Sequence, residues 1–236
     1  MEEAEIPLAG GRVTSGVVKL GETVRRPITG DRTLQHELLL HVERKGFTGC
    51  PRFLGIDKLG REILSFLPGD VPSDLGHYSD DQLSAAAEVL RGFHDATIDF
   101  APVAKQSAEV MCHNDWGPPN AVFRNKLPYA IIDFDTIAPG LRLWDLGYSA
   151  WFWLDLGSPE YTGDEQLRRL AVFADAYALL GCSVRQIAAY VLARQTTLAA
   201  WAKARGKIEM AAWATATAEW TVANVIKKLL PTAFPD

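Results

Sequence analysis

The sequence is most informative at Val110-Met-Cys-His-Asn-Asp-Trp-Gly-Pro-Pro-Asn-Ala-Val-Phe123 and at the following Tyr129-Ala-Ile-Ile-Asp-Phe-Asp135. Short apolar runs alternate here with polar loops, which predicts the order strand, loop, strand, turn, strand. His113, Asp115 and Asn120 fall in the first loop. Reactive side chains usually lie on loops held by rigid strands, so we expect the rest of the chain to support this segment.

The residue types in this stretch favour proton transfer and magnesium binding. Carboxylate and amide oxygens are hard ligands that suit Mg²⁺, which takes its other ligands from water and substrate phosphates. Asn120 and Asp133 can therefore hold a magnesium ion, while Asp115 can accept a proton from an attacking hydroxyl. The sequence Gly117-Pro-Pro119 would stiffen the loop between Asp115 and Asn120.

Length and composition are those of a globular protein. The 236 residues are 48% hydrophobic and 22% charged, which allows one large domain or two small lobes. The net charge is −5 and basic residues are not clustered, so we expect no nucleic-acid partner. The acidic start lacks an apolar signal core, and no apolar run could span a membrane. We expect a small-molecule substrate, and the acidic net charge would suit a cationic one. The oligomeric state stays open.

The three cysteines match neither a zinc-binding spacing nor a disulfide framework. They are Cys50, Cys112 and Cys182. Buried thiols in a reducing compartment are the simplest interpretation. We therefore expect a cytoplasmic protein, in a compartment where ATP is available.

The first part of the chain is expected to form a small antiparallel sheet with one helix. Gly10, Gly11, Gly16 and Gly21 punctuate β-branched runs, which predicts a β-meander. Gly10 and Gly11 can approach a phosphate, or they form a plain hairpin turn. The other elements expected here are a helix at 31–45, strands at 53–56 and 62–67, and a Pro/Gly-rich hinge at 68–73. We place the boundary there, with a first lobe at 1–67 and a second at 68–236.

The second lobe is expected to be mostly helical. Ser79 begins a Ser-x-x-Gln capping box before a strong helical pattern that extends to Ala96. The apolar and aromatic run from Trp144 to Leu154 contains one acid, Asp145. Further helices are expected at 164–180, 183–203 and 207–230, with caps at Asp164 and Ser183.

This order of motifs resembles the aminoglycoside phosphotransferase family, which includes choline kinase relatives. The resemblance rests on His113-x-Asp115-x-x-x-x-Asn120, on the following Ile132-Asp-Phe134 and Trp144-Asp-Leu146, and on the Gly-rich turn, hairpin and hinge before them. It covers nearly the whole chain. It implies an α+β, bilobal, protein-kinase-like fold with a small antiparallel-sheet lobe that binds nucleotide and a mostly helical lobe for catalysis.

The resemblance also implies an ATP- and Mg²⁺-dependent kinase that phosphorylates a hydroxyl of an aminoglycoside-like or amino-alcohol substrate, in antibiotic resistance or in metabolism. Asp115 would be the catalytic base, and Asn120 and Asp133 would hold the Mg²⁺ that bridges the ATP phosphates. His113 and Asp145 would brace the loop.

The nucleotide would be gripped from the first lobe. Arg25 takes the place of the family's basic phosphate-binding residue, with Arg26 as the alternative, because alternation lets only one of them point into the cleft. Glu37 would orient that arginine, and Glu43 is the second candidate. The remaining nucleotide-binding residues would be Gly10, Gly11, Ser65, Phe66 and Leu67, of which the last three would lie against the adenine.

Two other functions fit parts of the sequence. Asp133 and Asp135 match the nucleophile and acid/base of haloacid-dehalogenase phosphatases, but such folds need alternating strands and helices afterwards, and the pattern after Trp144 is helical. The second is a nucleotide-binding module without turnover, which the thin Gly-rich lobe and the arginine in place of lysine favour.

The sequence does not decide the identity of the phosphate acceptor or the choice between ATP and GTP. Four acids after the aromatic run either form a patch for a cationic substrate or belong to a solvated loop and helix cap. They are Asp155, Glu160, Asp164 and Glu165.

Overall fold

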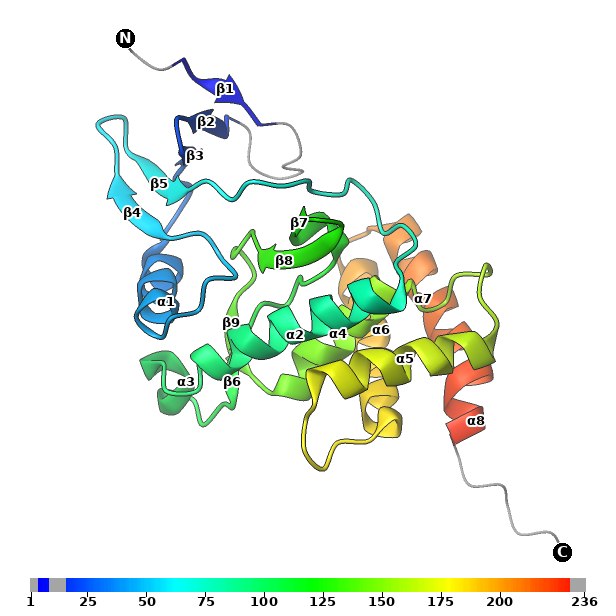
Figure 1. The fold of residues 1–236 in the computed structure, drawn as a ribbon. Coiled ribbons are helices and arrows are strands. Elements are labelled where there is room, and N and C mark those ends of the chain that lie inside the picture. The colour runs from blue at the N-terminus through cyan, green and yellow to red at the C-terminus, as the bar shows by residue number, and fades with distance from the viewer. Residues whose placement is uncertain (1–3, 9–15, 230–236) are drawn as a thin grey trace, which may run out of the picture.

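The computed structural model describes residues 4–8 and 16–229, and it consists of a small sheet at one end and a larger, mainly helical part (Figure 1). Gly10 and Gly11 lie outside the described residues. In Figure 1 the sheet sits above and to the side of the helices, and a long segment leads from β5 to α2.

The N-terminal sheet has five antiparallel strands in the order β1-β2-β3-β5-β4. The tight turn between β2 and β3 contains Gly21 at φ 57°, a backbone conformation that glycine adopts at little cost. Helix α1, Thr33–Arg44, contacts β4. The strands are β1 Ile6–Pro7, β2 Val18–Leu20, β3 Thr23–Pro27, β4 Phe53–Ile56 and β5 Arg61–Ser65.

Two short ladders carry the polar loops of the second part. Strand β6, Val110–Cys112, pairs with β9, Ala138–Gly140, and β7, Ala121–Arg124, pairs with β8, Leu127–Ile131. A 3₁₀ turn at Pro118–Asn120 precedes β7. Strand β9 was not predicted, because three residues with a central proline carry no periodic signal. The predicted strands of the catalytic segment thus lie in two separate ladders.

Helices form the remainder of the described chain. They are α2 Asp80–Ala96, α3 Ala101–Lys105, α4 Arg142–Leu154, α5 Gly163–Tyr177, α6 Val184–Ala204, α7 Ile208–Thr221, a π-helical turn Val222–Ile226 and α8 Lys227–Leu229. Ser79 forms the predicted capping box on α2. The cap of α5 is Thr162, whose hydroxyl accepts a hydrogen bond from Glu165 N, rather than the predicted Asp164.

The core lies where α2 packs against α5 and β8. Leu83, Leu90 and Phe93 on α2 have no exposed surface, and Trp116 and Trp153 complete the buried aromatic cluster. Burying side chains of this size supplies most of the favourable free energy of folding. The segment with the candidate catalytic residues is therefore attached to the buried core through Trp116.

The small antiparallel sheet and the helical remainder confirm the predicted α+β fold class. The division at residues 67 and 68 stays a prediction. In the hinge, Asp70 pairs with Phe123 of β7 through two backbone hydrogen bonds, so the hinge is attached to the second part.

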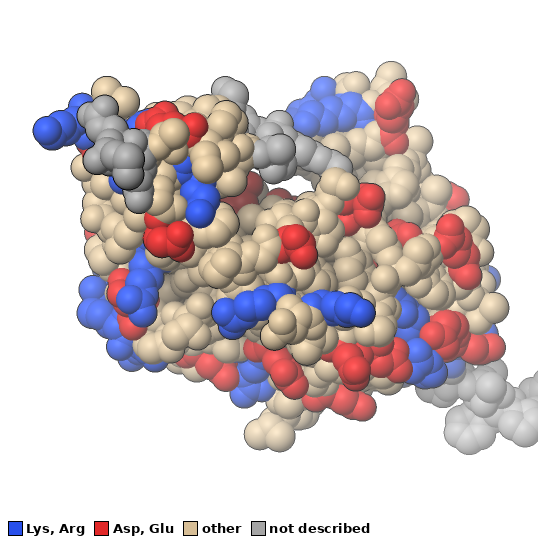
Figure 2. Space-filling view, turned by 45° about the horizontal axis from the view of Figure 1, so that its top comes forward, with Lys and Arg blue, Asp and Glu red and all other residues tan. Residues whose placement is uncertain are grey.

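The structure bears on three expectations from the composition, which concern the cysteines, membrane-spanning helices and the distribution of charge. Cys50 and Cys112 are buried, Cys182 is half-buried, and all three are free thiols. Within residues 4–8 and 16–229, no helix is long and apolar enough to cross a membrane. Acidic and basic side chains are interspersed on the face shown in Figure 2. The absence of a nucleic-acid partner and the cytoplasmic location stay predictions.

Candidate active site

The loop after β6 is held by a buried carboxylate on α4. Asp145 has no exposed surface, and its two oxygens accept hydrogen bonds from His113 N at 2.7 Å and Asn114 N at 2.8 Å. His94 of α2 donates from Nε2 to the same carboxylate over 3.0 Å. Its Nδ1 lies 2.6 Å from the hydroxyl of Tyr177, and this hydroxyl must donate because an imidazole with a protonated Nε2 accepts at Nδ1.

Burial opposes the charge of Asp145, but the hydrogen bond from His94 and those of the backbone N–H groups outweigh it. The pKa of Asp145 therefore lies below its usual value. Burial also lowers the pKa of His94, so the imidazole is neutral at pH 7. An ionised Asp145 beside a neutral His94 is the state that these contacts support.

Asn114, directly before Asp115, is held in a left-handed conformation with φ 66°. Its amide nitrogen donates to Thr136 O at 3.0 Å. Arg194 of α6 donates to the side-chain oxygen of Asn114 at 3.1 Å and to its carbonyl oxygen at 3.0 Å. A conformation that costs free energy persists only when its surroundings hold it on several sides, so these contacts fix the direction of the next residue.

Both oxygens of Asp115 accept a hydrogen bond. Tyr148 of α4 donates to Oδ1 at 2.5 Å, and Asn120 Nδ2 donates to Oδ2 at 2.8 Å. Burial and the adjacent charge of Asp115 raise the pKa of Tyr148 well above its usual value, so the phenol stays protonated. The Asp115 carboxylate is held in one orientation and keeps further lone pairs for an incoming hydroxyl.

Asp133 follows β8 at φ 64° and presents an oxygen that lacks a hydrogen bond. This Oδ1 is buried, and Arg26 Nη2 lies 3.6 Å from it. Burial and then the charge of Asp135 raise the pKa of Asp133. A metal cation bound to this oxygen would stabilise the charged form of Asp133 against both burial and the charge of Asp135.

The residues present fit a magnesium ion shared with a phosphate. Since Asn120 uses its amide nitrogen on Asp115, its amide oxygen is the atom that can join Asp133 as a ligand. Among the described residues, no three His, Cys, Asp or Glu side chains are grouped as a metal site. The protein would therefore supply few ligands, as Mg²⁺ bound to a nucleotide requires.

Of the two candidate arginines, Arg26 reaches the acids of the second part. Its Nη2 lies 2.5 Å from Asp135 Oδ2, and its Nη1 lies 3.3 Å from Glu62. Arg25 points to the other face of β3, where it donates to Thr23 Oγ1 at 2.5 Å and lies 3.7 Å from Asp57. The register of β3 against β5 thus places Arg26, the alternative, on the side of Asp133.

The acid beside Arg26 is Glu62 of β5, whereas Glu37 was expected in this place. Glu62 is buried, and it also contacts Arg32 at 3.3 Å and His36 Nε2 at 2.8 Å. Glu37 is exposed on α1. The second candidate, Glu43, lies 3.4 Å from Arg52. The side of α1 that turns toward β5 carries His36, so the acid comes from the strand instead.

Arg32 joins the same network by a short ion pair with Asp135, which Arg26 also contacts. These two hydrogen-bonded partners outweigh the burial of Asp135 and lower its pKa. Arg26 of β3 and Arg32, which directly precedes α1, thus hold the loop that follows Asp133.

The residues expected against the adenine lie at the end of β5 and just beyond it. Ser65 pairs with Thr23, and its Oγ accepts a hydrogen bond from Arg52 N at 2.8 Å. Phe66 N donates to Glu22 O, and the Lys19 ammonium lies 4.4 Å from the Phe66 ring centre. Ser65, Phe66 and Leu67 are all half-buried, and their role with adenine stays a prediction.

Three of the four acids expected for a cationic substrate have basic partners. Asp164 pairs with Lys228 at 2.5 Å and Glu165 with Arg168 at 2.8 Å. Glu160 lies 2.6 Å from His77 Nε2. Burial raises the pKa of the fourth, Asp155, and disfavours its charge. These contacts favour the alternative interpretation, in which the four acids belong to a loop and a helix N-terminus, over a patch that binds a cationic substrate.

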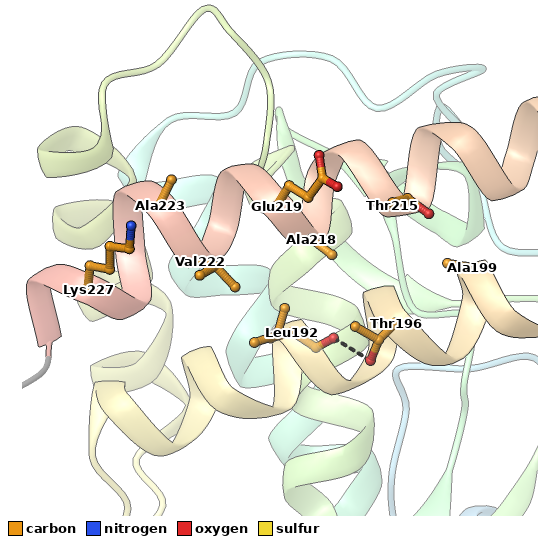
Figure 3. A pocket seen from close by; sticks show the side chains of 9 residues that line it. All are labelled: Leu192, Thr196, Ala199, Thr215, Ala218, Glu219, Val222, Ala223 and Lys227. Atoms are coloured by element: carbon orange, nitrogen blue, oxygen red, sulfur yellow. Dashed lines mark hydrogen bonds between the residues drawn. The ribbon is translucent and has the colours of Figure 1, made fainter.

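An open groove of about 580 Å³ lies between α6 and α7, and five of the nine residues that line it are apolar (Figure 3). Leu192 and Thr196 of α6 face it. Arg194 lies between them in sequence, and two residues correspond to about 200° of helical rotation, so Arg194 points to the opposite side of α6. The groove is therefore separate from the catalytic loop.

Sequence reasoning missed several residues that the structure places in the site: Arg32, His36, Glu62, Asn114, Tyr148 and Arg194. Some signals existed. Tyr148 follows Asp145 by three residues and so shares its face of a helix. Glu62 is the one acid in the strand predicted at 62–67, and Arg194 directly follows an apolar stretch of α6. Their partners come from distant elements, which periodicity does not reveal.

A small sheet beside a helical part, with a His-x-Asp-x-x-x-x-Asn loop and a following acid, defines the protein-kinase-like class. Residues 97–206 match the family model described as the phosphotransferase enzyme family. Together with the fold comparisons below, this match confirms the resemblance to the aminoglycoside phosphotransferases.

Among curated proteins, the chain is similar to the trifolitoxin immunity protein of Rhizobium leguminosarum bv. trifolii. The two are 32% identical over 161 residues, which cover 62% of this chain and 61% of that protein. The chain thus spans less than two thirds of the length of this relative.

Among solved structures, the chain is similar to a thermostable mutant of an aminoglycoside phosphotransferase in a ternary complex with ADP and hygromycin B. The TM-score is 0.61 at 14% identity, and 94% of each chain is covered. A choline/ethanolamine kinase family protein from Mesorhizobium loti has a TM-score of 0.58 at 15% identity, over 95% of this chain and 92% of that one. At these identities the likeness establishes the fold.

Proposed function

We propose that this protein is an ATP-dependent phosphotransferase that transfers the γ-phosphoryl group to a hydroxyl of a small molecule. The observation that carries the proposal is the Asp115 carboxylate, oriented by Tyr148 and Asn120, on a loop next to the Asp133 oxygen that lacks a hydrogen bond. A base of fixed direction beside a cation site is what phosphoryl transfer needs.

In the proposed mechanism the acceptor hydroxyl donates a hydrogen bond to Asp115. Its oxygen attacks the γ-phosphorus in line, the bond from phosphorus to the ADP oxygen breaks, and Asp115 takes the hydroxyl proton. Asn120 and Asp133 would hold Mg²⁺, which when bound neutralises charge on the phosphates. Arg26 would contact the phosphates from β3. Most of the acceleration would come from positioning, with about 10²–10⁴-fold from the base.

The two rival functions have less support. Between residues 142 and 229 the chain forms helices without strands, and its fold is protein-kinase-like, which is not the fold of a haloacid dehalogenase. Asp135, the acid/base of that alternative, is instead held by Arg26 and Arg32. A binding module without turnover would not need Asp115 to be oriented on both oxygens.

The biological role we favour is protection against a toxic small molecule. The named relative, an immunity protein, and the aminoglycoside phosphotransferase fold support this role over a metabolic one. The test is a coupled ADP-release assay with ATP or GTP and a panel of antibiotics, toxins and amino alcohols. Stimulation of ADP release by one acceptor class supports the proposal. Phosphate-ester hydrolysis without nucleotide would contradict it.

A further inference from the structure

A row of aromatic side chains leads away from the candidate base. The ring of Tyr148, whose hydroxyl contacts Asp115, stacks on Phe152 with 4.3 Å between centroids and 18° between planes. Phe152 meets Trp213 of α7 edge-on at 6.0 Å. At Gly117 an added Cβ would lie 3.1 Å from Phe152 Cβ, so the catalytic loop passes directly along this row.

The outer end of the row is accessible. Trp213 is 38% exposed and Met210, one turn earlier on α7, is 39% exposed, while Phe152 is half-buried. Helix α7 is predominantly apolar in composition, as is expected of a helix that is largely covered. Large apolar side chains that stay exposed together usually mark a binding surface.

The charges nearby do not suit a polycation. The acids expected to bind one are paired with Lys228, Arg168 and His77. The Arg194 guanidinium covers Tyr148 at 4.6 Å from the ring centre, which places a positive charge beside the row. The opposing charges are Asp115 itself and the exposed Glu209, one turn before Trp213.

On the basis of the proposed function, we propose that Phe152 and Trp213 form the wall against which the acceptor lies. The acceptor is then an alcohol with an extended apolar or aromatic face and at most one positive charge. Its hydroxyl reaches Asp115 while its apolar face covers Trp213 and Met210. Aromatic side chains give such contacts a large area at a low cost in conformational entropy.

The test compares two classes of probe by calorimetric binding in the presence of a non-hydrolysable ATP analogue and Mg²⁺. Chloramphenicol and erythromycin present apolar faces and hydroxyls, whereas hygromycin B is a polycation. We expect at least one of the first two to bind more tightly than hygromycin B. Trp213→Ala and Phe152→Ala should each weaken that binding about tenfold or more, and the ATP-analogue affinity should not change.

Trp201→Ala is the matched control, because Trp201 is 39% exposed but contacts Arg205 and Lys207 instead of the row. This variant should bind as the wild type does. Tighter binding of hygromycin B, binding of neither apolar probe, or unchanged binding by Trp213→Ala would overturn the inference. Binding without transfer of phosphate would count against the proposed function and leave the acceptor surface supported.

Discussion

Tyr148 is the residue whose contacts say most about how Asp115 is used. Its hydroxyl lies 2.5 Å from Asp115 Oδ1, and its ring is enclosed between Phe152 and the guanidinium of Arg194. Because its pKa is raised, the hydroxyl acts as a donor throughout the neutral range. In the proposed mechanism Tyr148 therefore positions the carboxylate without taking part in proton transfer.

Replacing Tyr148 by Phe should lower kcat about tenfold. A hydrogen bond to a charged group contributes roughly 1.5–3 kcal/mol, and without it Asp115 is free to rotate away from the acceptor. The Kd for ATP should stay the same, since Tyr148 contacts the base and not the predicted nucleotide residues. Steady-state kinetics with the acceptor found in the panel measures kcat. A Tyr148→Phe enzyme with wild-type kcat would show that the contact has no role in positioning.

Asp145 is expected to matter for stability. Asn in its place would direct an NH₂ group at the N–H of either His113 or Asn114, so Asp145→Asn should lower the free energy of unfolding by about 3 kcal/mol. The lowered pKa of Asp145 means that its contribution is present above pH 3.8 and is lost as the pH falls through the folded-state pKa.

Denaturant unfolding of the wild type and of Asp145→Asn across pH measures this contribution. The difference between the two proteins should be constant from neutral pH to about pH 4 and should narrow at lower pH. A difference that grows as the pH falls would contradict an ionised Asp145 in the folded protein.

At the level of helices and strands, most boundaries followed from the sequence and a few did not. Helix α2 was predictable because its capping box and apolar periodicity agree. Strand β9 was not, since its pairing with β6 depends on residues distant in sequence. The choice between Arg25 and Arg26 likewise depends on the register of β3 against β5, which alternation alone leaves open.

The candidate site likewise contains some residues that the sequence predicts and others that it does not. Asp115, Asn120 and Asp133 could be named because a polar motif on strand ends is a local pattern. Glu62 could not be named, because its place in the site depends on its contacts with Arg26, Arg32 and His36. These three residues are distant from Glu62 in the sequence. A local pattern thus suffices to propose the reacting groups, whereas the residues that hold them depend on tertiary contacts.

In the molecule as a whole, several contacts join the small sheet and α1 to the helical part, and two groups of them involve the loop after Asp133 and the hinge. One is the group of ion pairs from Arg26 and Arg32 to Asp135. The other is the hinge, where Asp70 pairs with Phe123 and Tyr129 Oη donates to Pro68 O at 2.9 Å. Arg26 Nη2 also lies 3.6 Å from Asp133 Oδ1, so the first connection couples the separation of the two parts to the geometry of the candidate metal site.

Gly69→Ala should weaken the hinge connection. Gly69 has φ 154°, and an added Cβ would lie 2.2 Å from Phe123 O, so the backbone has to move and the pairing of Asp70 is disrupted. We expect a loss of roughly 2–3 kcal/mol of stability. The control is Gly46→Ala, at φ 77° with open space around it, which should cost about 1 kcal/mol. Equal losses in thermal unfolding of the two variants would argue against the close approach.

The proposed phosphotransferase activity depends above all on Asp115, and the decisive measurement is formation of phosphorylated acceptor by the wild type and by Asp115→Asn. Phosphorus NMR or mass spectrometry detects the product, and titration with an ATP analogue reports binding. We predict that Asp115→Asn lowers kcat by about 10²–10⁴-fold and leaves nucleotide affinity unchanged. An Asp115→Asn protein that phosphorylates the acceptor at the wild-type rate would contradict the account.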